Sequence, residues 1–132
     1  MCDRKNAAMM LTLAREDLAI LEEMQNSVRV TDRSLGFHAQ QAVEKALKAW
    51  LAFAGADYPK SHDLGELLAL LADQAQTIPK AFLELDYLTD FAVLFRYTIT
   101  DLANEELDRA SLVRRVTEVV EHVQRLTGPS TA

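Results

Sequence analysis

Apolar residues recur at intervals of three and four along most of the chain, which is the pattern of amphipathic helices. Between residues 3 and 24 the apolar positions are Ala7, Met10, Leu11, Ala14, Leu18, Leu21 and Met24. Between residues 32 and 54 they are Leu35, Ala39, Ala42, Val43, Ala46, Leu47, Trp50, Leu51 and Ala54. The sequence therefore predicts two long helices, each with one buried face.

Capping residues mark the ends of these helices. Thr31 or Asp32 can begin the second helix by accepting a hydrogen bond from a free backbone N–H, and Gly55 ends it because glycine tolerates positive φ. Asp63, with Glu66 three residues later, gives a capping-box start to a third helix. The core-facing residues of that helix are Leu64, Leu67, Leu68 and Leu71.

Two further helices complete the pattern. Pro79 suits the first turn of a fourth helix, which we expect to end near Tyr97. Its apolar stripe is Ile78, Ala81, Phe82, Leu85, Leu88, Ala92 and Phe95. A fifth helix begins between Asn104 and Asp108 and ends at Gly128-Pro129. Its core face is Leu112, Val113, Val116, Val119, Val120, Val123 and Leu126.

These elements predict an all-α fold, an up-and-down antiparallel bundle of four to five helices joined by short connections. The length of 132 residues suits one domain over 1–132, with a core of about 4–127 and a frayed tail over 128–132. The single cysteine excludes an internal disulfide framework, and we find neither a signal peptide nor a membrane-spanning run. We therefore expect a cytoplasmic protein.

Acidic residues outnumber basic ones by 20 to 14, which gives a net charge of −6 and argues against a general nucleic-acid binder. The surplus lies beyond residue 50, because residues 1–50 hold seven acids and seven bases. In 84–108 the only base is Arg96, and the acids are Glu84, Asp86, Asp90, Asp101, Glu105, Glu106 and Asp108.

Familiar cofactor and metal motifs are not found. The three histidines lie in no zinc-binding spacing, and the four glycines form no phosphate-binding loop. We expect no metal and no bound cofactor.

A polar stripe on the second helix offers one candidate site. His38, Gln41, Lys45 and Lys48 are three or four residues apart and share one side of the helix, with Gln40 and Glu44 beside them. Such a stripe is either a solvated face, with Glu44 and Lys48 as an i, i+4 ion pair, or a row of donors for a phosphate or a base edge.

Two other segments offer polar groups near helix ends. In the loop Lys60-Ser61-His62-Asp63, which precedes the third helix, His62 either caps the helix locally or meets an anion at its N-terminus. Arg96 and Tyr97 stand among the acids of 84–108, where the arginine is either paired with an acid or binds phosphate or a partner.

The segments FHAQQAVEKALKAWL (37–51), YPKSHDLGELL (58–68) and LTDFAVLFRY (88–97), together with AREDLAIL (14–21), resemble the HEPN domain over about residues 7–125. The resemblance implies a helical bundle, usually dimeric, of a prokaryotic type that often forms a two-gene module with a minimal nucleotidyltransferase. Several such modules behave as toxin–antitoxin pairs. The implied ligand is a nucleotide, held by His38, Gln41, Lys45, Lys48, His62, Arg96 and Tyr97.

Many HEPN proteins are metal-independent RNases with an Arg-x4–6-His motif. Here Arg96 is followed by Asp101, Leu102 and Ala103, so the histidine is missing. The first hypothesis is therefore a nucleotide-binding partner of a nucleotidyltransferase without catalysis of its own. The alternatives are an RNase toxin that uses Arg96 and Asp101, and a ligand-free dimeric module whose acidic segment docks a basic partner.

Overall fold

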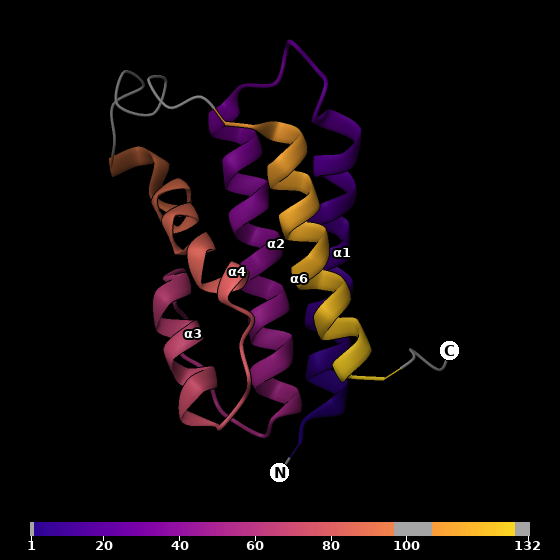
Figure 1. The fold of residues 1–132 in the computed structure, drawn as a ribbon, viewed down its shortest axis with the longest axis vertical. Helices are drawn as coiled ribbons and strands as arrows, with labels where there is room; N and C mark the ends of the chain where they lie inside the picture. The colour runs from indigo at the N-terminus through magenta and orange to yellow at the C-terminus, as the bar shows by residue number, and fades with distance from the viewer. Residues whose placement is uncertain (1, 97–106, 129–132) are drawn as a thin grey trace.

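The computed structural model describes residues 2–96 and 107–128, apart from the side chains of 93–96. All regular elements in these residues are helices, which confirms the predicted all-α fold (Figure 1). They are α1 (Arg4–Met24), α2 (Asp32–Phe53), α3 (Leu64–Asp73), α4 (Lys80–Leu83), the 3-10 helix η1 (Glu84–Arg96) and α6 (Arg109–Leu126). The predicted frayed tail lies, after Gly128, outside the described residues.

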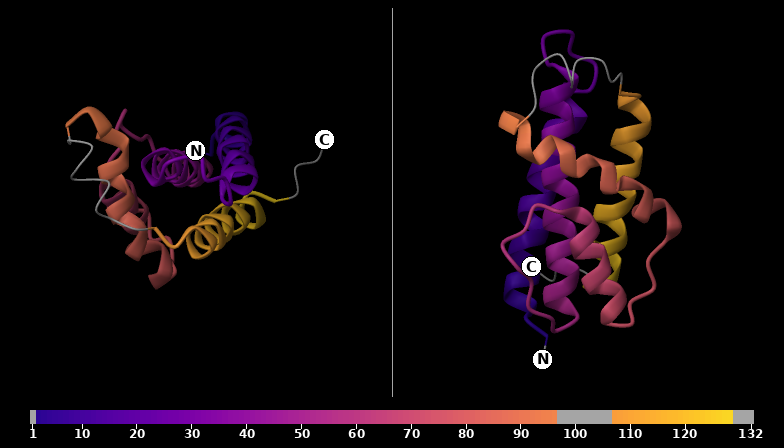
Figure 2. Two further views of the ribbon diagram at one scale, coloured as in Figure 1. Left: turned by 90° about the horizontal axis from the view of Figure 1, so that it is seen from above. Right: turned by 90° about the vertical axis from the view of Figure 1, so that its left-hand side faces the viewer.

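Helix α2 is the centre of the fold and contacts α1, α3, η1 and α6. Figure 2 shows α1 and α6 on one side of α2, and α3 with η1 on the other. Helix α1 runs antiparallel to α2 and α6 (Figure 1), and η1 crosses α2 obliquely (Figure 2). Trp50, in the last turn of α2, is buried, and its indole N–H donates to the Gln76 side-chain oxygen at 2.9 Å.

The caps of α2 and α3 follow the sequence prediction. The Thr31 hydroxyl accepts from the Ser34 N–H at 3.1 Å, and the Asp63 carboxylate accepts from the Glu66 N–H at 3.3 Å. The reciprocal half of the capping box is replaced by Ser61, whose Oγ accepts from the Asp63 N–H and donates to the Glu66 carboxylate. The loop before α3 is thus fixed by local hydrogen bonds.

The single helix predicted from Pro79 to Tyr97 is wrong. The chain forms one turn of α-helix, α4, and then the 3-10 helix η1. The buried residues Phe82, Leu85, Leu88 and Phe91 are spaced by three. A 3-10 helix, with three residues per turn, holds the last three of these in one row, whereas in an α-helix each would turn farther from the last. Phe91, absent from the predicted stripe, is part of the core.

Close packing of η1 on α2 depends on Gly36. A Cβ atom at this position would lie 2.3 Å from the Phe91 ring, well inside van der Waals contact. The missing side chain therefore lets the aromatic ring rest directly on the backbone of α2. This contact fixes η1 across the first half of α2 (Figure 2).

Arg109, at the start of α6, holds the connection between α1 and α2. Its Nε donates to Asp32 at 2.8 Å, and its other nitrogens donate to the carbonyls of Ser27 and Val30 at 2.9 and 2.6 Å. Asp32 also accepts from the Leu107 N–H. One guanidinium group therefore ties the starts of α2 and α6 to the same loop.

Candidate functional site

The polar stripe of α2 is not an open solvated face, because Gln40, Glu44 and Lys48 are buried and His38, Gln41 and Lys45 are half-buried. The exposed fractions of Gln40, Glu44 and Lys48 are 0, 4 and 7%. The predicted i, i+4 ion pair is confirmed, because the Lys48 ammonium lies 2.9 Å from the Glu44 carboxylate. A buried pair of charges needs further hydrogen bonds to compensate for lost hydration, and these come from the rest of the stripe and from the loop before α3.

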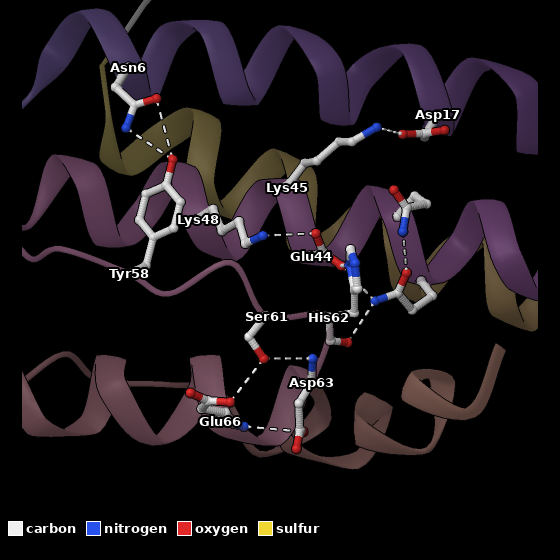
Figure 3. Close-up of polar contacts among 12 residues, drawn as sticks. Asn6, Asp17, Glu44, Lys45, Lys48, Tyr58, Ser61, His62, Asp63 and Glu66 are labelled. Atoms are coloured by element: carbon white, nitrogen blue, oxygen red, sulfur yellow. Dashed lines mark hydrogen bonds and ion pairs between the residues drawn. The ribbon is translucent and has the colours of Figure 1, made fainter. Parts of the chain in front are cut away.

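Glu44 is the acceptor at the centre of one cluster. Its Oε1 lies 2.9 Å from the Gln40 amide nitrogen and 2.8 Å from His62 Nδ1, while Oε2 faces Lys48. The same Gln40 amide nitrogen also donates to the His62 backbone carbonyl at 2.9 Å. The Gln40 side-chain oxygen accepts from the Gln41 amide nitrogen at 2.6 Å. We refer to these residues as the Glu44 cluster: Gln40, Gln41, Glu44, Lys48 and His62. Figure 3 shows the contacts of this cluster and those of the loop before α3.

This cluster favours the charged form of Glu44. Burial acts to raise the pKa of the Glu44 carboxyl, but hydrogen bonds from Gln40, Lys48 and His62 outweigh it, and the pKa is lowered. The group therefore contributes stability above the ordinary carboxyl pKa, and this contribution is lost as the pH falls through the lowered folded-state value.

A second cluster forms between α1 and α2 around Asp17. The Asp17 carboxylate lies 2.7 Å from the Lys45 ammonium and 3.1 Å from His38 Nδ1. We call these three residues the Asp17 cluster. Its two α2 side chains are more accessible than that of Lys48, with exposed fractions of 24% for Lys45 and 33% for His38.

Asp17 was absent from the sequence prediction, although its position carried a signal. It lies three residues after Ala14 and four before Leu21, both of them core residues, so helical spacing places an acid on the buried face of the first helix. A buried carboxylate requires a counter-charge, and the basic residues of the second helix are the nearest candidates in the pattern.

The structure thus divides the predicted ligand-binding set. His38 and Lys45 meet at Asp17, whereas Gln41, Lys48 and His62 belong to the Glu44 cluster. Lys45 extends toward α1, and Glu44 faces the loop before α3 (Figure 3). The Arg96 side chain, Tyr97 and Asp101 lie outside the described residues, so their predicted roles stay predictions.

All buried side-chain polar atoms among the described residues have hydrogen-bond partners within the protein. The two clusters are therefore complete without a ligand. Their accessible parts are the His62 side chain, which is 61% exposed, and the outer edges of His38 and Lys45. Among the described residues of the predicted set, these histidine rings and Lys45 are the groups that a ligand at α2 can reach from solvent.

The third histidine, His122, packs among aromatic rings of the core. Its ring centroid lies 5.1 Å from that of Trp50 and 5.2 Å from that of Phe82. Burial, and then the positive charge of Arg125, lower the pKa of His122. It is a packing residue that resists protonation and takes no part in either cluster.

In residues 2–96 and 107–128, no group of three His, Cys, Asp or Glu side chains is arranged to hold a metal ion. No helix in this part of the chain is long and apolar enough to cross a membrane. A family model for the HEPN domain matches residues 7–126. The chain belongs to the HEPN family. No curated protein and no solved structure matched this HEPN chain.

Proposed function

We propose that this HEPN protein is the nucleotide-binding component of a two-gene module with a minimal nucleotidyltransferase, of the toxin–antitoxin type. In this proposal it acts in the prokaryotic cytoplasm as a homodimer and has no catalytic step of its own. The support is the HEPN match over 7–126, combined with two clusters of histidine and lysine around α2.

The observation that carries the proposal is the charge balance of the two clusters. Lys45 balances Asp17, and Lys48 balances Glu44, so each cluster is neutral when its histidine is neutral. His38 and His62 each lie at an accessible edge of such a balanced pair. Each cluster is thus suited to a small anion but not to an extended polyanion, whose binding requires many unpaired cations.

The predicted residues do not share one role in this proposal. Lys45 and Arg96 hold phosphate, since Lys45 keeps a quarter of its side chain exposed. Gln41, His38 and His62 orient the ligand, and Tyr97 stacks on its base. Lys48, whose side chain is only 9% exposed and paired with Glu44, acts indirectly by holding that carboxylate and through it His62.

The test is titration of ATP into the pure protein by calorimetry, with the variants Lys45→Gln and His62→Gln. Loss of a charge-assisted contact is worth about a tenfold change in Kd. The matched control is Lys60→Gln, which removes an exposed lysine that forms no ion pair within the described residues. Equal ATP binding in all four proteins, or none in the wild type, would contradict the proposal.

The partner is tested separately. We expect a small nucleotidyltransferase to be encoded beside this protein and to co-elute with it in size-exclusion chromatography. An unrelated neighbouring gene, or two proteins that elute apart, would remove the module from the proposal. Intact RNA after long incubation with the pure protein is expected, because the RNase motif lacks its histidine.

One observation favours the interaction module as a second candidate. A groove of about 470 Å³ between α3 and the start of η1 is lined by apolar residues such as Leu68, Ile78 and Leu83, with Asp86 at its edge. Leu83 and Tyr87 are 46 and 43% exposed. An apolar groove beside acidic side chains suits a basic amphipathic partner.

This candidate predicts that the partner associates more slowly as salt rises, and that Leu83→Ser weakens the complex while leaving ATP binding unchanged. Met9→Ser is the matched control, since Met9 is exposed on α1, away from the groove. An association rate insensitive to salt would count against it.

A further inference from the structure

A pocket of about 390 Å³ lies on the opposite face of α1 from Asp17. Its walls come from α1, the last turn of α2 and the end of α6, with Arg4, Leu11, Arg15, Phe53, Gln124 and Gly128 among the lining residues. Arg4, Leu11 and Arg15 are spaced by seven and four, so they form one stripe along the helix. The first turn of α1 and the last turn of α6 meet at the same end of the bundle (Figure 1).

Among the described residues, no carboxylate lines this pocket or pairs with its arginines. The described residues that line it include two arginines and no Asp or Glu. Neither Arg4 nor Arg15 forms an ion pair with another described residue, in contrast to Lys45 and Lys48 on α2. In a protein with a net charge of −6, two such arginines in one pocket favour an anion there.

The Arg15 guanidinium is held in place by a neutral residue, Gln124. Its Nε donates to the Gln124 side-chain oxygen at 2.9 Å, and its Nη2 donates to the same oxygen. A guanidinium group has five N–H donors, so three remain for a ligand, while the amide leaves the positive charge intact. A preoriented guanidinium is well suited to bind phosphate through two parallel hydrogen bonds.

The other end of the pocket has different chemistry. The Arg4 guanidinium lies over the Phe53 ring, 5.5 Å from its centroid. This leaves the outer face of a flat, delocalised group for stacking with a planar ring. The Cα atoms of Arg4 and Arg15 are about 16 Å apart along the helix, because eleven residues each rise 1.5 Å. The pocket therefore suits an elongated ligand with two dissimilar ends.

The C-terminus of α6 also reaches this pocket, and its carbonyls carry partial negative charge. Three of these carbonyls already accept hydrogen bonds: Val123 from the Thr127 N–H, Gln124 from the Thr127 hydroxyl and Arg125 from the Gly128 N–H. Their repulsion of an anion is reduced, while Arg4 lies at the positive end of α1.

We infer that this pocket binds a phosphate ester with a planar ring at its far end. The phosphate lies against the Arg15 guanidinium, and the ring lies toward Arg4 and Phe53. The volume is within the range of pockets that bind small molecules. The site is separate from the α2 clusters and does not rest on the nucleotide site proposed there.

The test is a two-dimensional amide NMR titration of the whole protein with ADP, and with pyrophosphate as the probe that lacks a ring. We expect saturable shifts of the Thr12, Arg15 and Gln124 signals with both probes, and of the Ala8 and Phe53 signals with ADP only. Arg15→Gln should raise the Kd of both probes about tenfold, which is the effect of losing one charge-assisted contact. Arg4→Gln should weaken ADP alone.

Arg114→Gln is the matched control, because Arg114 is an exposed arginine of α6 outside the pocket and should leave both titrations unchanged. Absence of saturable shifts in the pocket, or an unchanged Kd in Arg15→Gln, would overturn the inference. Shifts confined to the Lys45 and His62 signals would also overturn the inference. That result would instead support the nucleotide site on α2. ADP shifts at the pocket that survive Lys45→Gln support the pocket whatever happens on α2.

Discussion

The two faces of α1 differ in whether the positive charges beside them are paired with a carboxylate. On one face Asp17 balances Lys45 and orients His38, both of which come from α2. On the other face Arg15 is held by the neutral amide of Gln124, and its charge has no counterpart among the described residues. The same helix thus contributes to a cluster that is electrostatically complete and to a pocket that is not.

This difference separates stabilising charge from charge that is available for binding. A buried charge must be paired to offset its lost hydration, which is the state of Glu44 and Lys48. An exposed arginine remains hydrated and can exchange water for a ligand at little cost. The comparison therefore predicts large stability effects on the α2 side, which decrease with exposure, and binding effects without stability effects in the pocket.

The largest effect is expected from Glu44→Gln. This change leaves the Lys48 ammonium buried without a counter-charge, and we expect the free energy of unfolding to fall by about 3 kcal/mol in urea denaturation. The double variant Glu44→Gln/Lys48→Met should recover much of this loss, because the unpaired charge is gone. A single variant as stable as the wild type would show that the pair is not effectively buried.

Asp17→Asn should cost less, about 1 kcal/mol in the same measurement, because Lys45 and His38 can reach water. It also sharpens the comparison by giving the α2 face an unbalanced lysine, as in the pocket. We therefore expect ATP to bind more tightly to Asp17→Asn than to the wild type. Weaker binding would mean that Asp17 itself contacts the ligand.

A smaller effect concerns pH and His122, which packs against Trp50 and Phe82 outside both regions. Its pKa is lowered in the folded protein by burial and by Arg125, so the unfolded chain binds the proton more readily. Stability should therefore fall as the pH drops from 7 toward 5, through and below the ordinary histidine pKa. In His122→Gln this part of the slope should be absent; parallel urea midpoints for both proteins over this range would disprove it.

The smallest effect on stability is expected in the pocket. Arg15→Gln should change the free energy of unfolding by no more than about 0.5 kcal/mol, because its guanidinium is exposed and water can replace its contacts. Arg114→Gln should be equally neutral in urea denaturation. If Arg15→Gln alone lowered the free energy of unfolding by more than about 1 kcal/mol, Arg15 would be a packing residue. The contrast between paired charge on α2 and available charge in the pocket would then be wrong.

The sequence was a good guide wherever the determining contacts are local. The caps at Thr31 and Asp63, the positive φ of Gly55 and the Glu44–Lys48 pair all involve residues within four positions of each other. Such contacts follow from helix geometry alone. Periodicity also identified the buried faces of α1, α2, α3 and α6, apart from Met24 and Leu126, which are exposed because they lie in the last turns of their helices.

The sequence was a poorer guide where a distant partner decides the outcome. The row of buried residues at Leu85, Leu88 and Phe91 has a spacing that an α-helix does not align, and its selection depends on packing against Gly36 of α2. The polar stripe was expected either to be solvated or to bind a ligand, and neither interpretation included its packing against α1 and the loop before α3.

The sequence by itself determined the helices, most of their ends, their apolar faces and, through its motifs, the HEPN family. Only the tertiary structure decided which charges are paired, because Asp17 and His62 are 28 and 18 residues from the groups that they meet on α2. It also formed the pocket, since Arg15 and Gln124 are 109 residues apart. Helical periodicity shows that a side chain faces inward, whereas the neighbour it meets there is fixed by how the helices pack.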